Sequence, residues 1–435
     1  MDRKTPAAMS TRVLLVGVVK SGRERWAKIE GLEELAALCK TSGGTVIEKL
    51  IQVRSHPDPA TLIGKGKARE LNTICTTYDI HLIVFDDELT PTQIRNLEDI
   101  IGVRVIDRPA LILDIFAIHA RTAEAKTQVE LAQLEYLKTR LTGSGLEMSR
   151  LGGGIGTRGP GETQLEVDRR RIEQRIQTLR QRLARIDRER QVQRKRRSNI
   201  LQFVLVGYTN AGKSTVFNRL TRAHTKVSDE LFATLDANTR LLRLSHNISA
   251  VLTDTVGFIR NLPTQLIASF RSTLAEIKDA DLILHIADAS APQVNEQIAA
   301  VKETLQGLGV GEKPTLLIFN KIDRVFDETV LLRLKEHYED SVFISALTGY
   351  GIEKLLKKIR SFVNRLLITK TFIIPSERWD LVTQILNAGE LLGDEEINGK
   401  RRLKIRSFPA EIARLRKLLT AGRLTAEGST AIPLF

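Results

Sequence analysis

The sequence predicts an α/β protein built from several domains, and three observations lead to this prediction. Short apolar runs rich in β-formers alternate with helical patterns, which is typical of parallel sheets covered by helices. One such run leads into a glycine-rich loop and then a helix, the arrangement of a phosphate-binding unit. A chain of 435 residues also has room for about three domains at roughly 150 residues each.

The first domain, residues 1–123, is predicted to be a separate α/β unit. Four segments are strand-like: Arg12–Val19, Thr45–Val53, His81–Phe85 and Val103–Ile106. Three segments between them are helix-like: Ile29–Lys40, Lys65–Thr77 and Thr90–Ile101. Gly64-Lys65-Gly66-Lys67 opens one of these helices and is compatible with a bound phosphate. It lacks the full loop pattern, so an ordinary helix start remains the alternative.

The second part, residues 124–198, is predicted to be a helical hairpin rich in arginine. Ala125–Leu141 has a helical pattern, and a second apolar seam recurs at three and four residues through Leu165, Ile172, Ile176, Leu179, Leu183 and Ile186. Between Asp168 and Arg197 stand thirteen basic residues against four acidic ones. A solvated charged face is the plain interpretation. The excess of arginine, which binds phosphate in a bidentate way, favours contact with nucleic acid.

A loop with six glycines joins the two predicted helices, over residues 151–161. So many glycines allow the backbone to approach a ligand closely. The loop is therefore predicted to be either a second anion site or an RNA-insertion loop, and the sequence does not decide between them. The candidate RNA-binding residues of the hairpin and its loop are Arg150, Arg158, Arg169, Arg170, Arg171 and Arg175.

The third part begins with a strand-like run, 201–206, and a loop that fits G-x-x-x-x-G-K-[ST]. Backbone N–H groups of such a loop, and of the helix that follows it, point at phosphate oxygens. Lys213 is expected to reach the outer phosphates, and the Ser214 hydroxyl to ligate Mg²⁺. The candidate nucleotide-binding residues are Gly207, Tyr208, Thr209, Asn210, Ala211, Gly212, Lys213, Ser214 and Thr215.

Three further motifs follow in order, each at the end of a predicted strand. In D-x-x-G, Asp254 can hold the metal through water and the Gly257 N–H can meet the γ-phosphate. In N-K-x-D, Asp323 can accept two hydrogen bonds from guanine, and adenine presents the wrong donors there. The final strand, 341–347, ends in the S-A pair typical of a guanine contact. The candidates are Asp254, Thr255, Val256, Gly257, Asn320, Lys321, Ile322, Asp323, Ser345, Ala346 and Leu347.

Together these four motifs predict a P-loop GTPase domain over residues 199–369, binding GTP or GDP with Mg²⁺. A second metal ligand is expected from a threonine in a segment that responds to the nucleotide. Thr234 is preferred to Thr239 because it lies in F-A-T-L-D, which resembles the equivalent stretch of Obg-like GTPases; the segment supplies Phe232, Ala233, Thr234, Leu235 and Asp236. The predicted catalytic residues are Lys213, Thr234 and Gly257.

Phe258 follows the D-x-x-G motif at the position where Ras-like enzymes carry a glutamine that orients water. Phe258 cannot do this, so either the enzyme is slow or another group, supplied by a partner, orients the water. Asn210 suggests a potassium ion that neutralises phosphate charge, as in several GTPases without the glutamine. Equal hydrolysis rates in potassium and sodium would exclude that hypothesis.

The last part, residues 370–435, is predicted to be a small α+β domain. It has strand-like segments at 371–374 and 402–407, and helix-like segments at 379–388 and 409–419. The whole chain carries a formal net charge of +14, which favours an acidic polyanionic partner. No apolar stretch approaches the roughly 20 residues that cross a membrane. Two distant cysteines and an N-terminus without a signal-peptide core lead us to expect a cytoplasmic location.

The chain resembles the HflX family of GTPases, and the resemblance covers nearly all of it. The segments that carry it include Gly64–Leu71, Phe85–Pro91, Gln93–Leu97, Leu113–Phe116, the stretch Gly-Pro-Gly-Glu-Thr-Gln at 159–164 and the four GTPase motifs. Ala237 stands where the family often has proline, which leaves the geometry of the neighbouring switch segment less well defined. Carried over by position, Ser214 and Thr234 resemble the magnesium ligands of the family.

The resemblance implies a ribosome-associated GTPase that binds the large subunit and its rRNA and splits stalled or idle ribosomes. A GTP-dependent assembly or regulatory factor that binds rRNA without splitting subunits is the alternative. By either interpretation we expect no DNA partner and at most a peripheral association with membranes.

Overall fold

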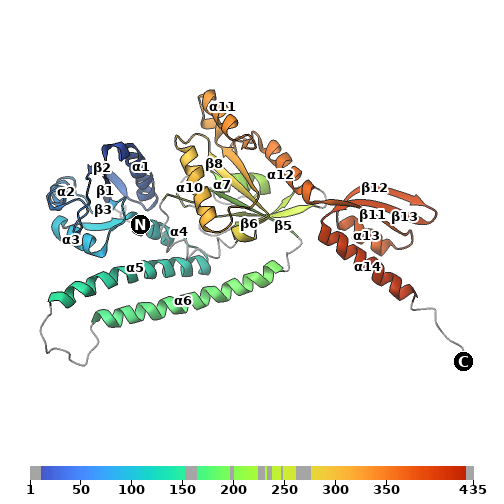
Figure 1. Ribbon diagram of the computed structural model, residues 1–435, viewed down its shortest axis with the longest axis horizontal. Coiled ribbons are helices and arrows are strands. Elements are labelled where there is room, and N and C mark those ends of the chain that lie inside the picture. The colour runs from blue at the N-terminus through green and yellow to red at the C-terminus, as the bar shows by residue number, and fades with distance from the viewer. Residues whose placement is uncertain are drawn as a thin grey trace, which may run out of the picture. The chain divides into compact units, whose positions relative to one another are not determined.

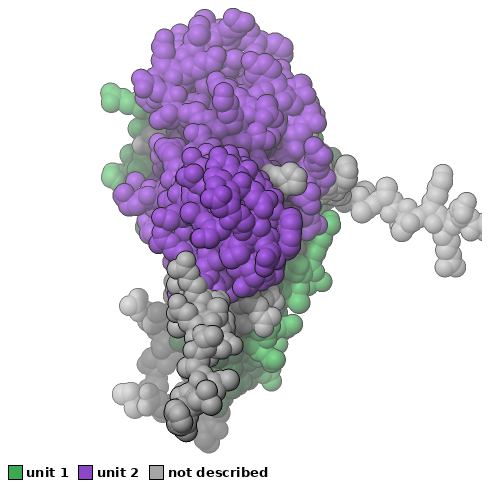
Figure 2. Space-filling view, turned by 90° about the vertical axis from the view of Figure 1, so that its right-hand side faces the viewer, with its two compact units in different colours: residues 1–190, 227–237, 256–275 green, residues 191–226, 238–255, 276–435 purple. Residues whose placement is uncertain are grey.

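The computed structural model describes residues 11–151, 164–195, 200–223, 231–232, 238–245, 248–260 and 276–427. The chain forms two compact units (Figure 2). Unit 1 comprises residues 1–190, 227–237 and 256–275, and unit 2 comprises residues 191–226, 238–255 and 276–435. Within the described ranges, no helix has both the length and the apolar character needed to cross a membrane.

Unit 1 contains a four-stranded parallel sheet with the strand order β2-β1-β3-β4. The strands are β1 (Arg12–Val19), β2 (Thr45–Val53), β3 (Leu82–Phe85) and β4 (Arg104–Asp107). Around it lie η1 (Gly22–Glu24), α1 (Arg25–Thr41), α2 (Lys65–Tyr78), α3 (Pro91–Ile101) and α4 (Arg108–His119) (Figure 1). Residues of β1 and β3 form one buried core with α2 and α3. The expected α/β fold is therefore confirmed for this part.

Helix α4 was not expected from the sequence. Its residues are apolar almost all round, and seven of its twelve are buried, so no polar face marks a helical period. Its start is nevertheless well defined, because the Asp107 side chain accepts the Ala110 N–H at 3.1 Å. Helix α3 begins with a full capping box, in which Thr90 and Gln93 bond each other's backbone N–H groups.

The predicted hairpin is present as two long helices, α5 (Ala123–Leu151) and α6 (Gln164–Lys195), side by side (Figure 1). Leu131 of α5 is buried against Ile176 and Leu179 of α6. Two ion pairs flank this seam, Arg175–Glu130 at 2.7 Å and Arg180–Glu135 at 2.8 Å. The linking residues 152–163, which contain the glycine-rich loop and Arg158, lie outside the described part of the chain.

A buried carboxylate fastens helix α5 to the sheet of unit 1. Asp107 ends β4 and is fully buried. It accepts the Tyr136 hydroxyl at 2.5 Å and pairs with the Arg140 guanidinium at 2.9 Å. It also caps Ala110 and accepts the Leu89 N–H at 3.2 Å, so that one side chain has partners on α4, on α5 and in the segment before α3. A single buried charge therefore joins the hairpin to the sheet and to α4.

Unit 2 is built on a six-stranded sheet with the order β10-β9-β8-β5-β7-β6, in which only β6 runs antiparallel to its neighbour. Its strands are β5 (Leu201–Gly207), β6 (Asn238–Arg243), β7 (Ser249–Asp254), β8 (Leu282–Asp288), β9 (Thr315–Asn320) and β10 (Val342–Phe343). The last strand is much shorter than the run 341–347 that the sequence suggested, because the chain turns from Ile344 into the loop that carries Ser345 and Ala346.

Helices cover this sheet: α7 (Lys213–Thr221), α10 (Val294–Gly307), α11 (Glu328–His337) and α12 (Ile352–Leu366), with η2 (Ile322–Arg324) after β9. Phe203, Leu205 and Leu284 belong to a buried cluster that α7 and α12 complete. Burial on both faces explains why these strands are continuous apolar runs without alternation.

After α12 the chain forms a small three-stranded antiparallel sheet of order β11-β13-β12. It comprises β11 (Ile368–Pro375), β12 (Glu390–Ile397) and β13 (Lys400–Ser407), with α13 (Trp379–Asn387) and α14 (Pro409–Glu427). The two helices share one core with the inner face of the sheet. The small α+β fold is as expected, but β12 was not predicted.

We predict that Asp107→Asn weakens the attachment of α5. The substitution leaves Arg140 opposite a neutral group in a buried setting, which we expect to cost about 3 kcal/mol. Hydrogen exchange of the α5 amides measures this directly. The control is Asp340→Asn, which removes an exposed carboxylate paired with Lys358. If the α5 amides lose no more protection in Asp107→Asn than in Asp340→Asn, the role assigned to Asp107 is wrong.

Candidate nucleotide site

The candidate site lies at the carboxyl edge of the six-stranded sheet. Strand β5 is flanked by β7 on one side and β8 on the other. Connections that leave a strand in opposite directions open a crevice at its carboxyl end, where ligands of open α/β sheets bind. Gly207, Asp254 and Asn320 end β5, β7 and β9. The topology thus brings three of the sequence motifs to one edge.

Lys213 closes the loop that follows β5. Its side chain is buried, and its ammonium group donates to the carbonyl oxygens of Gly207 at 3.2 Å and Tyr208 at 2.8 Å. These contacts curl the loop around the lysine at the start of α7, whose first N–H groups lack acceptors within the helix. Asn210 is exposed on this loop with a φ of 58°. Its assignment to a potassium ion stays a prediction.

Two glycines are required at this site by close approach of other groups. A Cβ on Gly207 would lie 2.1 Å from the Ile286 carbonyl oxygen of the neighbouring strand. A Cβ on Gly212, where φ is 89°, would lie 2.3 Å from the Asn320 amide nitrogen. Any side chain at either position would push the loop away from the sheet.

Burial sets the charge state of Lys213. Removal of the ammonium group from water lowers the pKa of Lys213 to about 8, and the charge of Lys321 lowers this pKa further while Asp254 opposes the change. An anion bound in the loop would favour the charged form and raise the pKa again. The lysine therefore holds its proton more firmly once a phosphate is bound.

Ser214 and Asp254 form the part of the site that fits a magnesium ion. The Ser214 hydroxyl donates to Asp254 Oδ2 at 2.7 Å. Asp254 is 1 % exposed, its Oδ1 atom has no hydrogen-bond partner among the described residues, and burial raises the pKa of its carboxyl group. A buried carboxylate oxygen without a partner is costly. Magnesium prefers oxygen ligands and retains several waters, so this pair suits a metal held by the hydroxyl and, through water, by the carboxylate.

Asn320 organises the side of the site assigned to the base. Its amide donates to the Ala211 carbonyl at 3.0 Å and accepts the Ala346 N–H at 3.0 Å. One side chain therefore joins the phosphate loop to the loop after β10. Asp323 lies in η2 with an exposed carboxylate. Leu347 is 71 % exposed, and its carbonyl accepts the Arg219 guanidinium at 2.9 Å.

The structure describes only part of the segment that is predicted to respond to the nucleotide. Thr234, with Ala233, Leu235 and Asp236, lies outside the described residues, so its role as a metal ligand stays a prediction. The alternative, Thr239, lies on β6 with its hydroxyl 3.3 Å from that of Thr253. Phe232 is buried against the ring of Phe116, with centroids 4.6 Å apart. Phe258 is also buried.

The arginines assigned to RNA have different environments. Arg175 is paired with Glu130 across the hairpin, and Arg169 lies 3.4 Å from Glu173 on its own helix. Arg170 and Arg171 are exposed. Helix α5 includes Arg150, whose side chain is not described. The pairing of Arg175 could not be predicted from its own helix, because its partner is 45 residues away.

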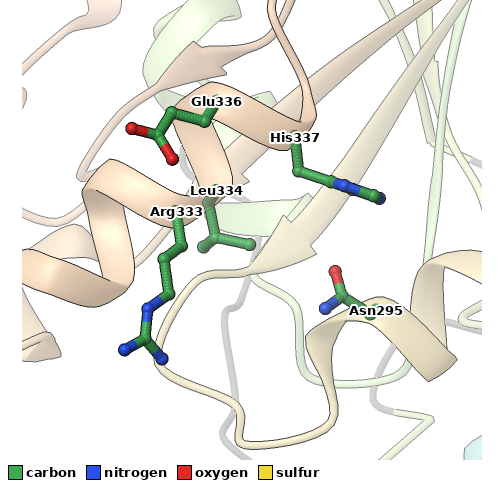
Figure 3. A pocket seen from close by; sticks show the side chains of 5 residues that line it. All are labelled: Asn295, Arg333, Leu334, Glu336 and His337. Carbon is green, nitrogen blue, oxygen red and sulfur yellow. The ribbon is translucent and has the colours of Figure 1, made fainter.

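A further cavity of about 430 Å³ lies between α10 and α11 (Figure 3). Asn295 comes from α10, and the other lining residues come from α11: Arg333, Leu334, Glu336 and His337. None of the motif residues that the structure describes lines it.

Asp288 at the end of β8 contacts Lys321 of the N-K-x-D motif and was not predicted from the sequence. Like Asp254, Asp288 ends a buried apolar strand, and this pattern in the sequence could have identified it as a site residue.

Three family models match the chain. One described as "GTP-binding GTPase N-terminal" matches residues 29–117, and one described as "GTP-binding GTPase Middle Region" matches 119–197. The third, "50S ribosome-binding GTPase", matches residues 202–321. The fold and the site thus define a P-loop GTPase, an enzyme that hydrolyses GTP.

Curated relatives narrow this class to one family. A GTPase HflX from Caldanaerobacter subterraneus is 43% identical over 386 residues, covering 88% of both chains. One from Lacrimispora saccharolytica is 46% identical, covering 88% of this chain and 90% of its own. One from Escherichia coli is 43% identical, covering 80% and 83%. The chain belongs to the HflX family of GTPases.

Among solved structures, a GTP-binding protein from Sulfolobus solfataricus in complex with GDP is 26% identical. The match covers 82% of this chain and 100% of that chain, with a TM-score of 0.42. The family assignment rests on the curated relatives and the family models.

We predict that nucleotide affinity falls as pH rises above about 8, the value to which burial lowers the pKa of Lys213. Above that pH the free protein loses the proton, whereas the complex keeps it because phosphate stabilises the charged form. Affinity should fall by up to about tenfold per pH unit until the pKa of the complex is reached. GDP binding at pH 8.5 should take up a proton, seen by calorimetry in two buffers of different ionisation enthalpy. A binding enthalpy independent of the buffer would contradict this.

Proposed function

We propose that the chain is a ribosome-associated GTPase that binds the large subunit through rRNA and splits stalled or idle ribosomes. The main support is that a model described as "50S ribosome-binding GTPase" matches the same chain that carries an arginine-rich hairpin. GTP binding would favour the conformation that docks on the ribosome, and hydrolysis would permit release. Location in the cytoplasm belongs to the same proposal.

The assignment of site residues to the nucleotide is also part of the proposal. Lys213 binds the outer phosphates, Ser214 and Thr234 ligate Mg²⁺, and Asp254 holds it through water. The Gly257 N–H meets the γ-phosphate, and Asp323 accepts two hydrogen bonds from guanine. When bound, Mg²⁺ neutralises the charge that develops on the phosphates. What supports these roles is the convergence of three strand ends at one edge and the unsatisfied oxygen of Asp254.

The proposal also assigns a part of the chain to each domain. Residues 1–123 form the N-terminal domain, 124–198 the RNA-contacting hairpin, 199–369 the GTPase domain and 370–435 the C-terminal domain. Along α6, Arg175 and Arg180 are occupied by Glu130 and Glu135 of α5. Among the described side chains of α6, Arg182 and Arg188 are exposed and form no ion pair, which makes them better candidates for phosphate contact than Arg175.

We expect Arg182→Ala with Arg188→Ala to reduce the salt dependence of rRNA binding. Each phosphate contact contributes about 0.7–0.9 to the slope of log K against log salt, so the slope should fall by about 1.5. The measurement is binding to a large-subunit rRNA fragment at several salt concentrations. A matched control, Lys358→Ala with Arg378→Ala, removes two surface cations from unit 2. Equal slopes for the two double variants would exclude α6 from the RNA interface.

Splitting is tested by light scattering of 70S ribosomes mixed with the full chain. A non-hydrolysable GTP analogue should lower the scattering as subunits separate, because docking and not hydrolysis would drive the separation. Sedimentation should then place the protein with the large subunit. If the protein sediments with large subunits but never lowers the scattering under any nucleotide, splitting is excluded. The chain would then be a GTP-dependent assembly or regulatory factor.

A further inference from the structure

Strand β8 ends in a carboxylate that contacts the site assigned to guanine. Asp288 lies next to Asn320 in the sheet register. Its Oδ2 atom is 2.8 Å from the Lys321 ammonium group, and the two side chains are only 17% and 13% exposed. Asp288 belongs to none of the four sequence motifs. Its ion-pair partner, Lys321, nevertheless belongs to the N-K-x-D motif.

The orientation of Asp288 is fixed from its other side. Its Oδ1 atom accepts the Ser290 N–H at 3.0 Å and the Ser290 hydroxyl at 2.6 Å. The backbone between them is tied to β9, because the Ala289 N–H donates to the Asn320 carbonyl at 2.8 Å. Both oxygens of the carboxylate are therefore used, and the anion is held in one place. A partner held in this way loses little side-chain entropy when the ion pair forms.

Lys321 itself has an unusual conformation. Its φ is 61°, in the left-handed region, which is unfavourable for a residue that carries a Cβ. Its Cε atom lies 3.9 Å from the position that a Cβ on Gly212 would occupy. The aliphatic stem thus crosses beside the phosphate loop on its way to Asp288. Without the carboxylate, the ammonium group would be free to leave this path, and its charge would act on Lys213 without compensation.

We propose that Asp288 is a positioning residue for guanine nucleotides. It holds the stem of Lys321 beside the phosphate loop, so that the stem forms a fixed apolar surface against which the purine ring packs. Lysine stems cover apolar surface in this way while the charged end is bound elsewhere. This inference rests on the assignment of residues 320–323 to guanine in the proposed function.

The test is steady-state GTP hydrolysis and GDP dissociation by the full chain carrying Asp288→Asn. Asparagine keeps an acceptor for Ser290 but loses the charge that holds Lys321. The KM for GTP and the rate of GDP dissociation should each rise roughly tenfold, and kcat should change less than twofold. Asp288→Glu, which restores the charge, should recover part of the affinity. Asp340→Asn, which removes an exposed partner of Lys358 in the same unit, should leave KM unchanged.

A double-mutant cycle shows whether Asp288 acts through Lys321. In a Lys321→Ala background, Asp288→Asn should have no further effect on KM. An unchanged KM in the single variant would overturn the proposal. So would a fall in kcat equal to the loss of affinity and accompanied by a lower melting temperature, because that pattern indicates a merely structural role.

The guanine assignment has a separate test. Asp323→Asn replaces an acceptor by an amide that matches the carbonyl of xanthine, so it should shift preference from GTP towards xanthosine triphosphate. Without that shift the assignment of residues 320–323 is wrong, whatever the Asp288 variants show. With the shift but an unchanged KM for Asp288→Asn, only the positioning role is wrong.

Discussion

The site depends on one buried side chain more than on any other. Asn320 is 2 % exposed and bonds the loop after β5 through Ala211 and the loop after β10 through Ala346. Buried amides must have both their donors and acceptors used, so these two loops are fixed relative to each other before any ligand binds. The same contact requires glycine at position 212, since the amide occupies the space of a side chain. A consequence is that the phosphate and base sides of the site form one rigid unit.

Within this frame the charged groups are incompletely satisfied. Within the part of the chain that the structure describes, Asp254 Oδ1 has no hydrogen-bond partner. Burial lowers the pKa of Lys213 and raises the pKa of Asp254, which favours the neutral form of each group. Such an arrangement is costly in the isolated protein, and a triphosphate with its metal would supply the missing charges. Because the free site is less stable than the occupied one, nucleotide binding stabilises the bound conformation more strongly.

The sequence predicted the parts of the fold that have a strong period or a motif, and it missed parts that depend on tertiary partners. Most of the parallel strands were predictable because burial on both faces produces long apolar runs, and the phosphate loop was predictable from its motif. Strand β8 was not predicted, although it is also an apolar run. Helix α4 was missed since it is apolar almost all round. Strand β12 was missed because it is acidic and contains Gly393. Its acids pair with the basic strand beside it, in Glu390–Arg406 and Asp394–Arg401.

For the site, the motifs identified residues whose chemistry is local, such as Lys213 and Ser214. They did not identify Asp288, whose role depends on a neighbour in the sheet and not in the chain. The exposed arginines of α6 present the same difficulty, because only the structure shows which of them are already paired with α5.

The attachment of α5 at Asp107 also has a mechanical meaning. At 1.5 Å per residue, the 29 residues of α5 extend about 43 Å. Tyr136 and Arg140, which clamp the helix, lie near its middle and leave roughly half of its length on either side. Leu151 at the end of α5 is 15 residues beyond Tyr136, or about 22 Å along the axis. A rotation of about 5° at the clamp would therefore move that end by about 2 Å and the opposite end in the reverse direction. A small adjustment at the edge of a four-stranded sheet is thereby transmitted to both ends of α5 at once.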